Sequence, residues 1–308
     1  MDVVRGHQHC PAWAGAAVAI GNFDGVHIGH RALIDRAREL AAATDAKAIA
    51  LTFDPPPSAL LAPRSAPKQL ITLARRLELM EAAGLDAVVV EPFTRELASL
   101  SPHVFIDEIV LGALRARAII VGYDFSYGAG RAGSTAALRA HGGRAGIEVA
   151  IVPPVEAGGE VASSTKIRGY LRDGDVTAAA RLLGRPYDVD GIVVHGAKRG
   201  RAIGVPTANI SFEGDFPLAL GIYAVTLSVE GGPPLPAVAS LGTNPTFVER
   251  GGRVLEVHVL DFEGDLYDRR VRTTFVAHLR DELKFDSVDA LIVQIGADIA
   301  HARTKLSG

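Results

Sequence analysis

Residues 21–30, which read Gly-Asn-Phe-Asp-Gly-Val-His-Ile-Gly-His, limit the fold of this 308-residue chain more than any other segment. A short apolar run at 16–20 precedes them, and the stretch that follows carries apolar side chains on one helical face between Leu33 and Ala41. This order predicts a buried strand, a glycine-rich turn and the start of a helix. Such a turn lets backbone amides approach an anion closely, and the helix N-terminus adds positive partial charge.

Two histidines mark the start of the predicted helix. His27 and His30 are three residues apart, so they fall on the same side of the first helical turn and both can reach a phosphate there. A glycine-rich turn alone is weak evidence for phosphate binding, whereas His-x-Gly-His between a strand and a helix is more specific. The pattern indicates attack on the α-phosphate of a nucleoside triphosphate, with pyrophosphate leaving.

Composition sets the broad class of the protein. The chain is long enough for two domains, and its charged fraction of 22% and hydrophobic fraction of 48% are ordinary for a globular protein. The net charge of −3 and pI near 6.4 give no sign of bulk nucleic-acid binding. Cys10 is the single cysteine, which suits a reducing compartment. With no signal-like segment or membrane-length apolar run, we expect a cytoplasmic protein without a membrane partner.

The first half alternates between β-branched apolar runs and helical patterns. The runs are at 47–53, 86–91, 117–122 and 148–153, and the helical patterns are at 70–83 and 101–114. In the second helix Ser101 is the expected N-cap and Pro102 the first helical residue. This alternation predicts a doubly wound α/β domain with a parallel sheet, whose ligands bind beyond the C-terminal ends of the strands.

The second half reads as a small antiparallel β-barrel with a C-terminal helix. Short strands separated by glycine and proline are expected at 191–195, 221–229, 235–242, 254–262 and 271–277, with little helix before Val288. We place the domain boundary near residue 187, which gives domains at 1–187 and 188–308. His7, His9 and Cys10 could be taken as metal ligands, but three ligands in a flexible-looking N-terminal segment make a poor zinc site.

Three further segments of the first half carry chemistry. Residues 52–57, Thr-Phe-Asp-Pro-Pro-Pro, form a stiff loop at the ligand edge or simply a rigid surface loop. Residues 121–128, Val-Gly-Tyr-Asp-Phe-Ser-Tyr-Gly, can orient a flat heterocycle, or are a glycine-rich turn with core aromatics. The hydroxyls of 163–168, Ser-Ser-Thr-Lys-Ile-Arg, are helix caps or part of a phosphate clamp.

Two segments of the second half also contain residue types that suit ligand binding or catalysis. Residues 196–209 form a basic, glycine-rich loop that ends in Pro-Thr-Ala-Asn; lysine and amides suit nucleotide phosphates, and Thr207 and Asn209 offer oxygens for Mg²⁺. A solvated hairpin is the alternative. Around 254–260 the residues alternate, with Leu255 and Val257 on one face and Glu256 on the other. On composition alone Glu256 is a solvent-facing carboxylate.

Taken together, these motifs resemble, in order, the bifunctional prokaryotic FAD synthetases, which combine riboflavin kinase with FMN adenylyltransferase. The resemblance runs from about Ala16 to Arg303 and also includes 241–247 and 279–285. It implies a Rossmann-like nucleotidyltransferase domain followed by a kinase barrel, with riboflavin, FMN, FAD and ATP as ligands and Mg²⁺ as cofactor. The chain departs from the family at Pro56, Tyr127 and Asn244, where other residues are usual.

The resemblance also implies residue roles. His27 and His30 would steady the phosphates during adenylyl transfer, and Glu256 would be the general base for the riboflavin 5′-hydroxyl. Residues expected to bind ATP phosphates in the adenylyltransferase are Gly21, Asn22, Phe23, Asp24, Gly25, Ser163, Ser164, Thr165 and Arg168. Those expected to bind its flavin are Phe53, Pro55, Pro57, Asp124, Phe125 and Tyr127. In the kinase the phosphate residues would be Gly196, Lys198, Arg199, Gly200, Gly204 and Pro206, and the metal ligands Thr207 and Asn209.

Two other hypotheses stay open at this point. One is an enzyme that keeps only one of the two activities, and the other is a non-catalytic flavin or nucleotide sensor. The intact appearance of both sets of motifs argues against each. The sequence leaves the oligomeric state open, including a homo-oligomer.

Overall fold

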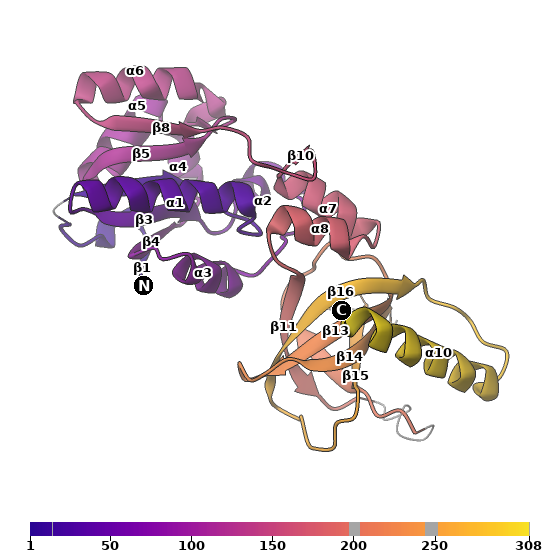
Figure 1. The fold of residues 1–308 in the computed structure, drawn as a ribbon. Coiled ribbons are helices and arrows are strands. Elements are labelled where there is room, and N and C mark those ends of the chain that lie inside the picture. The colour runs from indigo at the N-terminus through magenta and orange to yellow at the C-terminus, as the bar shows by residue number, and fades with distance from the viewer. Residues whose placement is uncertain (14, 197–203, 244–251, 308) are drawn as a thin grey trace. The chain divides into compact units, whose positions relative to one another are not determined.

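The computed structural model describes residues 1–13, 15–196, 204–243 and 252–307, which form two compact units (Figure 1). The first unit consists of Met1–Lys68 and Leu73–Ser163, and the second of Gln69–Thr72 and Ser164–Gly308. These units describe how the chain packs and not which residues carry each activity. The boundary between the two catalytic domains near residue 187 therefore stays a prediction.

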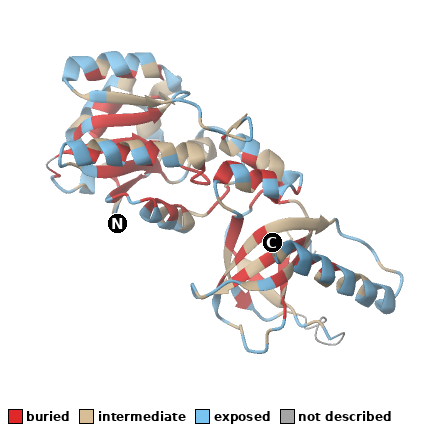
Figure 2. Cartoon of the chain, in the orientation of Figure 1, coloured by how far each residue is buried: buried red, intermediate tan, exposed pale blue. Residues whose placement is uncertain are grey.

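A six-stranded parallel sheet forms the centre of the first unit. Its strand order is β1-β4-β3-β2-β5-β8, with every neighbouring pair parallel. The bounds are β1 (Asp2–Arg5), β2 (Ala16–Ile20), β3 (Lys47–Phe53), β4 (Ala87–Glu91), β5 (Ala116–Gly122) and β8 (Glu148–Val152). Every residue of β2 and β4 is buried, as expected for central strands covered on both faces (Figure 2).

Helices connect these strands. Their bounds are α1 (Ile28–Ala43), α2 (Pro57–Leu61), α3 (Leu73–Ala82), α4 (Arg95–Ser99), α5 (Pro102–Val104) and α6 (Thr135–Ala145). Helix α1 buries Leu33, Ile34, Ala37 and Ala41, which confirms the apolar face predicted from the spacing. Short pieces complete the unit: the 3₁₀ turns His7–His9 and Ala129–Arg131, and two-residue strands β6 (Ser126–Tyr127), β7 (Gly133–Ser134), β9 (Glu156–Ala157) and β10 (Glu160–Val161).

The helix expected at 101–114 differs in type over most of its length. Ser101 caps it by accepting a hydrogen bond from the Val104 amide, as predicted. From Phe105 to Ala113 the chain is a π-helix, and the Leu114 amide bonds to the carbonyl of Ile109, five residues earlier. Apolar periodicity predicted a helix here, but it does not distinguish an α-helix from a π-helix.

The N-terminal segment is more ordered than the sequence indicated. β1 pairs in parallel with β4, and both the amide and Nδ1 of His7 hydrogen-bond to the buried Glu91 carboxylate, at 2.7 and 2.9 Å. His9 bonds to the carbonyl of Arg5, and burial, with Glu91 nearby, raises the pKa of the Cys10 thiol to about 11. Among the residues that the structure describes, no group of three or more His, Cys, Asp or Glu could hold a metal ion.

The second unit contains a closed barrel of six antiparallel strands, in the order β11-β12-β15-β14-β13-β16. The bounds are β11 (Tyr187–Val194), β12 (Ala208–Phe212), β13 (Gly221–Val229), β14 (Leu235–Thr243), β15 (Arg253–Val259) and β16 (Arg270–Arg280). The C-terminal helix α10 (Val288–Leu306) packs on β13 and β16. The predicted combination of a parallel α/β sheet and a barrel with a terminal helix is confirmed, although strand β12 was not predicted.

Two helices precede the barrel in this unit. α7 (Ser164–Arg172) packs on α8 (Val176–Leu183), and α8 contacts β11 and β16. The fully buried Tyr187 donates a hydrogen bond of 2.9 Å to the carbonyl of Leu70, so residues 69–72 are built into the second unit. Within the described ranges, no helix of either unit is both long and apolar enough to cross a membrane.

Candidate active sites

His27 and His30 form a stacked pair at the N-terminus of α1. Their ring centroids are 3.7 Å apart with an angle of 17° between the planes, and the Phe23 ring lies 5.3 Å from His30. His27 is the N-cap residue of α1, and its Nδ1 accepts a hydrogen bond from the His30 amide at 3.3 Å. The predicted arrangement of both histidines on one side of the first turn is confirmed.

The hydrogen bond at the cap determines where His27 holds its proton. Because a backbone amide can only donate, Nδ1 of His27 must accept, and the neutral imidazole therefore carries its proton on Nε2. Within the described residues, the Nδ1 of His30 is buried and has no hydrogen-bond partner. Burial, followed by His27 and Arg76, lowers the pKa of His30 well below its usual value. His27 therefore presents an Nε2–H donor, and His30 is an uncharged ring at neutral pH.

The turn at 21–25 packs tightly against the end of β3. Thr52 is fully buried, and its hydroxyl donates to the carbonyl of Asn22 at 3.2 Å. Phe23 has a φ of 51° and is completely buried, and its ring packs against the ring of His30. Gly25, with a φ of 86°, has a backbone conformation that glycine adopts most readily. Asp24 is buried at 7% exposure, whereas Asn22 is exposed.

The residues predicted to hold the flavin lie at or beyond the C-terminal ends of β3 and β5, the two strands that flank β2. Phe53 ends β3 and packs edge-on against Phe93 at 5.6 Å. Pro55 is exposed, and Pro57 is the first residue of α2. Because parallel strands end at the same edge of a sheet, this loop and the histidine turn share that edge.

The aromatic residues after β5 contribute differently. Phe125 stacks on Tyr127 with ring centroids 5.4 Å apart and 15° between the planes. Tyr127 belongs to the hydrophobic core, and burial raises the pKa of its hydroxyl. Phe125 is half-buried and Asp124 is exposed at the sheet edge. The core role considered for the aromatics therefore applies to Tyr127, which supports Phe125.

The Ser-Ser-Thr-Lys-Ile-Arg segment starts a helix, as predicted. Ser163 ends the first unit, while Ser164, Thr165 and Arg168 lie in α7 of the second. Their participation in the phosphate site of the first unit stays a prediction.

In the barrel, Asn209 and Glu256 lie directly opposite each other on neighbouring strands β12 and β15. Directly paired residues point to the same face of a sheet, so the amide and the carboxylate are neighbours. Leu255 and Val257 are fully buried while Glu256 is half-buried, which confirms the predicted alternation along β15. The structure therefore gathers the predicted base and one predicted metal ligand at one place.

The ends of the preceding loop lie beside this pair. Gly196 approaches Asn209 so closely that a Cβ there would collide with the Asn209 amide. The Nδ1 of His258 lies 2.8 Å from the carbonyl oxygen of Pro206, next to Thr207. Gly204 has a φ of 78°. Lys198, Arg199 and Gly200 fall outside the described residues, and so does Asn244.

Comparison with known proteins shows the family of this chain. The family model for FAD synthetase matches residues 10–166, and the one for riboflavin kinase matches residues 183–306. The bifunctional riboflavin kinase/FMN adenylyltransferase of Pseudomonas fluorescens is 40% identical over 98% of this chain and 97% of its own length. This chain belongs to that family. The protein of the same name from Escherichia coli K12 is 38% identical over the same shares of the two chains.

A solved structure is similar to this chain over nearly its whole length. A crystal structure of a Streptococcus pneumoniae protein named macrolide-efflux protein matches with a TM-score of 0.88 and 32% identity, over 98% of this chain and 99% of that one. The efflux function in that name is said of the Streptococcus pneumoniae protein and is not carried over to this chain. The match shows that the two chains share the same kinds of fold in the same order over nearly their whole length.

Sequence reasoning missed one buried residue of the adenylyltransferase region. Arg76 in α3 is 1% exposed, and its Nη1 donates to the Thr52 hydroxyl and to the carbonyl of Phe53, both at 3.3 Å. The only signal was its position within an apolar helical pattern, where an arginine is unusual.

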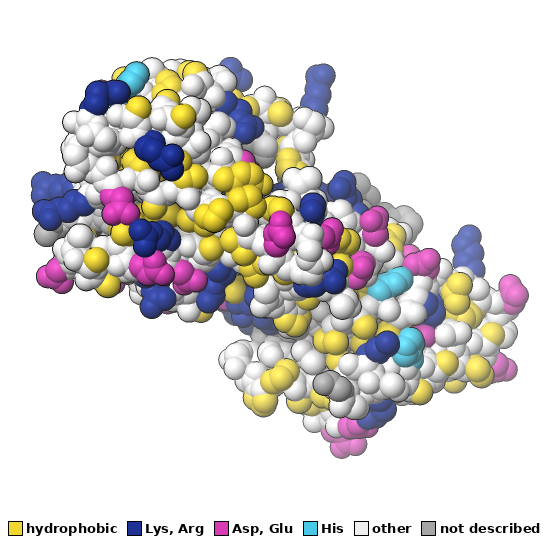
Figure 3. All heavy atoms as spheres, turned by 45° about the horizontal axis from the view of Figure 1, so that its top comes forward, with side chains coloured by type: hydrophobic (Ala, Val, Ile, Leu, Met, Phe, Trp, Pro, Cys, Tyr) yellow, Lys and Arg dark blue, Asp and Glu magenta, His cyan; other side chains and the backbone are white. Residues whose placement is uncertain are grey.

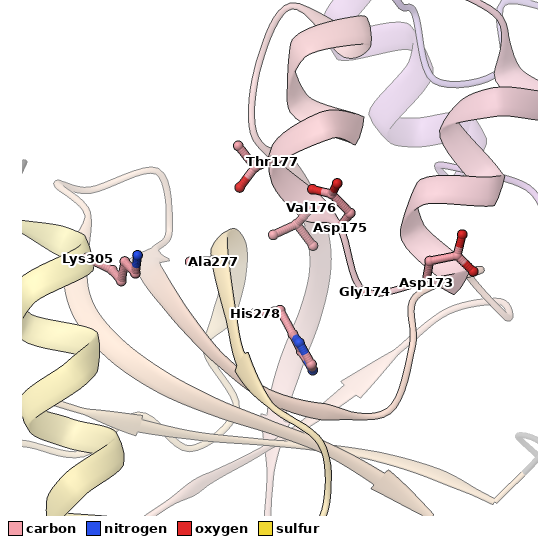
Figure 4. A pocket seen from close by; sticks show the side chains of 8 residues that line it. All are labelled: Asp173, Gly174, Asp175, Val176, Thr177, Ala277, His278 and Lys305. Carbon is pink, nitrogen blue, oxygen red and sulfur yellow. The ribbon is translucent and has the colours of Figure 1, made fainter.

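Two surface features lie apart from the motif residues. A shallow pocket of about 320 Å³ lies between the α7–α8 connection, β16 and α10; it is lined by Asp173, Asp175, His278 and Lys305 among others, and by none of the predicted site residues (Figure 4). On the face shown in Figure 3, Lys and Arg side chains are interspersed with Asp and Glu rather than gathered in one large patch.

Proposed function

We propose that this chain makes FAD from riboflavin in two ATP-dependent steps, each at its own site. The barrel transfers the γ-phosphoryl group of ATP to riboflavin, which gives FMN and ADP. The α/β domain transfers AMP from a second ATP to FMN, which gives FAD and pyrophosphate. The observation that carries this proposal is the assembly of two separate constellations, His27 with His30 and Asn209 with Glu256, each within one compact unit.

The adenylyl transfer needs no nucleophile from the protein. An FMN phosphate oxygen attacks the α-phosphorus of ATP, and the bond to the pyrophosphate oxygen breaks. The Nε2–H of His27 and the N-terminus of α1 stabilise the negative charge that develops on the phosphates. We assign Phe125 to the flavin ring and, on the basis of their motif alone, Ser164, Thr165 and Arg168 to the leaving pyrophosphate.

In the kinase step, Glu256 accepts the proton of the riboflavin 5′-hydroxyl while that oxygen attacks the γ-phosphorus. The Asn209 amide lies opposite this carboxylate, and the Thr207 hydroxyl, two residues earlier in the chain, is a second oxygen donor of the same motif. Mg²⁺ prefers oxygen ligands together with phosphate oxygens. The donor set therefore fits Mg²⁺, which neutralises phosphate charge when bound. We assign Lys198, Arg199 and Gly200 to the same ATP on the basis of their motif alone.

The proposal is tested with purified protein, riboflavin and Mg-ATP, followed by separation of the flavins. FAD as product supports both activities, and FMN alone indicates a kinase that has lost the second step. An adenylyltransferase without kinase activity shows turnover only when FMN is supplied, and no turnover with either flavin indicates a binding protein. We further propose that the enzyme works in the cytoplasm; its oligomeric state is open to measurement by sedimentation.

A further inference from the structure

Arg76 is a buried charged residue that is linked through Thr52 to the turn at residues 21–25. Burying a guanidinium costs folding free energy unless hydrogen bonds and opposite charges compensate. A buried arginine is therefore expected to have such partners. Two partners are the Thr52 hydroxyl and the Phe53 carbonyl at the end of β3. Burial lowers the pKa of Arg76, while the carboxylates of Asp24 and Asp54 raise it.

A chain of hydrogen bonds runs from this guanidinium to the phosphate turn. Arg76 donates to the Thr52 hydroxyl, and the same hydroxyl donates to the carbonyl of Asn22. The turn that receives this bond contains Phe23 at a φ of 51° and is followed directly by Val26 at a φ of 40°, two non-glycine residues with left-handed backbone. Such conformations persist only where the surroundings hold them in place.

We propose that Arg76 is a positioning residue of the adenylyltransferase site, which holds the 21–25 turn through Thr52 in the conformation that receives the ATP phosphates. The inference rests on the proposed function, because the turn must be a phosphate site for its conformation to affect turnover. Arg76 does not itself touch the reacting atoms in this view. Its charge acts at a second place, since with burial and His27 it lowers the pKa of His30.

The test compares three variants with a control. Arg76→Met removes the charge and the hydrogen bonds, Arg76→Lys keeps the charge, and Thr52→Val breaks the link to Asn22 while leaving the charge in place. Arg36→Met is the control, because Arg36 is a partly exposed arginine of the same unit that pairs with Glu39 and Glu148. For each protein we would measure kcat and KM for FMN adenylylation, riboflavin phosphorylation, and the His30 pKa by NMR titration of its imidazole.

We expect Arg76→Met to lower kcat/KM for FMN adenylylation on the order of 10²-fold, as misplacement of a catalytic group does, while riboflavin phosphorylation continues. Arg76→Lys should fall between this variant and the wild type. Thr52→Val should lose adenylylation but keep the wild-type His30 pKa, whereas Arg76→Met should raise that pKa. A purely structural role would not separate these two readouts.

Wild-type adenylylation in both Arg76→Met and Thr52→Val would overturn the inference. If Arg76→Met also loses kinase activity, the chain has misfolded and Thr52→Val decides: full adenylylation in it overturns the inference, and a selective loss supports it. Failure of the proposed function has a different signature, because the wild-type protein itself would then form no FAD from FMN and ATP.

Discussion

At the residue scale, the protonation of His27 and His30 follows from burial and one backbone hydrogen bond. The helix cap leaves Nε2–H of His27 as the donor, and burial together with His27 and Arg76 keeps His30 uncharged at neutral pH. A stacked pair of imidazoles 3.7 Å apart would repel if both were protonated. The two rings are therefore a unit, in which removing either changes the other.

His30→Ala should lower FAD formation from FMN sharply. The variant loses a phosphate contact made in the transition state, which costs about 2.7–4 kcal/mol, or 10²–10³-fold in kcat. Riboflavin phosphorylation should continue, because His30 belongs to the first unit and Glu256 to the second. Steady-state assays of both reactions on one preparation check this, and an equal loss of both activities in a folded variant would contradict it.

Glu256→Gln should lower riboflavin phosphorylation and leave the adenylylation of FMN unchanged. The substitution keeps the size of the side chain beside Asn209 but removes the base, so FMN formation should fall by roughly 10²–10⁴-fold. Riboflavin and ATP binding should change little, and FAD formation from added FMN should keep the wild-type rate. Normal phosphorylation of riboflavin by this variant would return Glu256 to the solvent-facing role that composition alone indicates.

At the element scale, the sequence predicted elements wherever one physical signal dominated. Apolar runs predicted β2 and β3 with their observed bounds, and Ser101 was recognised as a helix cap. β1 was missed because its residues are polar enough to resemble a loose terminus, and β12 because its residues overlap the Pro-Thr-Ala-Asn motif. Arg76 was missed because its partners come from a strand 23 and 24 residues away, which spacing does not reveal.

The cap of α8 gives a test at this scale. The Asp175 side chain accepts a hydrogen bond of 2.8 Å from the Ala178 amide, at the start of a helix that buries Leu182 and Leu183. Asp175→Ala should destabilise this helix by about 0.5–2 kcal/mol, and Asp175→Asn, which can still cap, by less. Urea titrations followed by riboflavin kinase activity measure the difference. Identical midpoints for the two variants would show that the cap does not limit stability.

At the scale of the whole molecule, the two family models match successive stretches of the chain, residues 10–166 and 183–306, and the chain forms two compact units. The sequence predicted both kinds of fold, because alternation of strand and helix and a run of short strands are distinct patterns. It also predicted that His27 and His30 share one side of a helix, whereas the direct pairing of Asn209 with Glu256 across two strands is seen only in the structure. It could not predict that residues 69–72 join the second unit, because no local pattern encodes a four-residue tertiary contact.

Separate sites predict complementation between variants. A mixture of His30→Ala and Glu256→Gln should make FAD from riboflavin, although each variant alone makes little. The first supplies FMN and the second adenylylates it, so the rate should rise with the concentration of both. Chromatography of the flavins over time provides the measurement. A mixture no more active than its components would mean that FMN does not pass through solution.

The hydrogen bond from Tyr187 to Leu70 has a consequence for how the chain is made and divided. The ribosome synthesises residues 69–72 well before α7, α8 and the barrel. These four residues can therefore take their final contacts only after the rest of the second unit has been synthesised. No single cut in the gene can then yield both halves intact. A fragment that begins after Ser163 lacks the Leu70 carbonyl and leaves the buried Tyr187 hydroxyl without this acceptor, at a cost of about 1–3 kcal/mol.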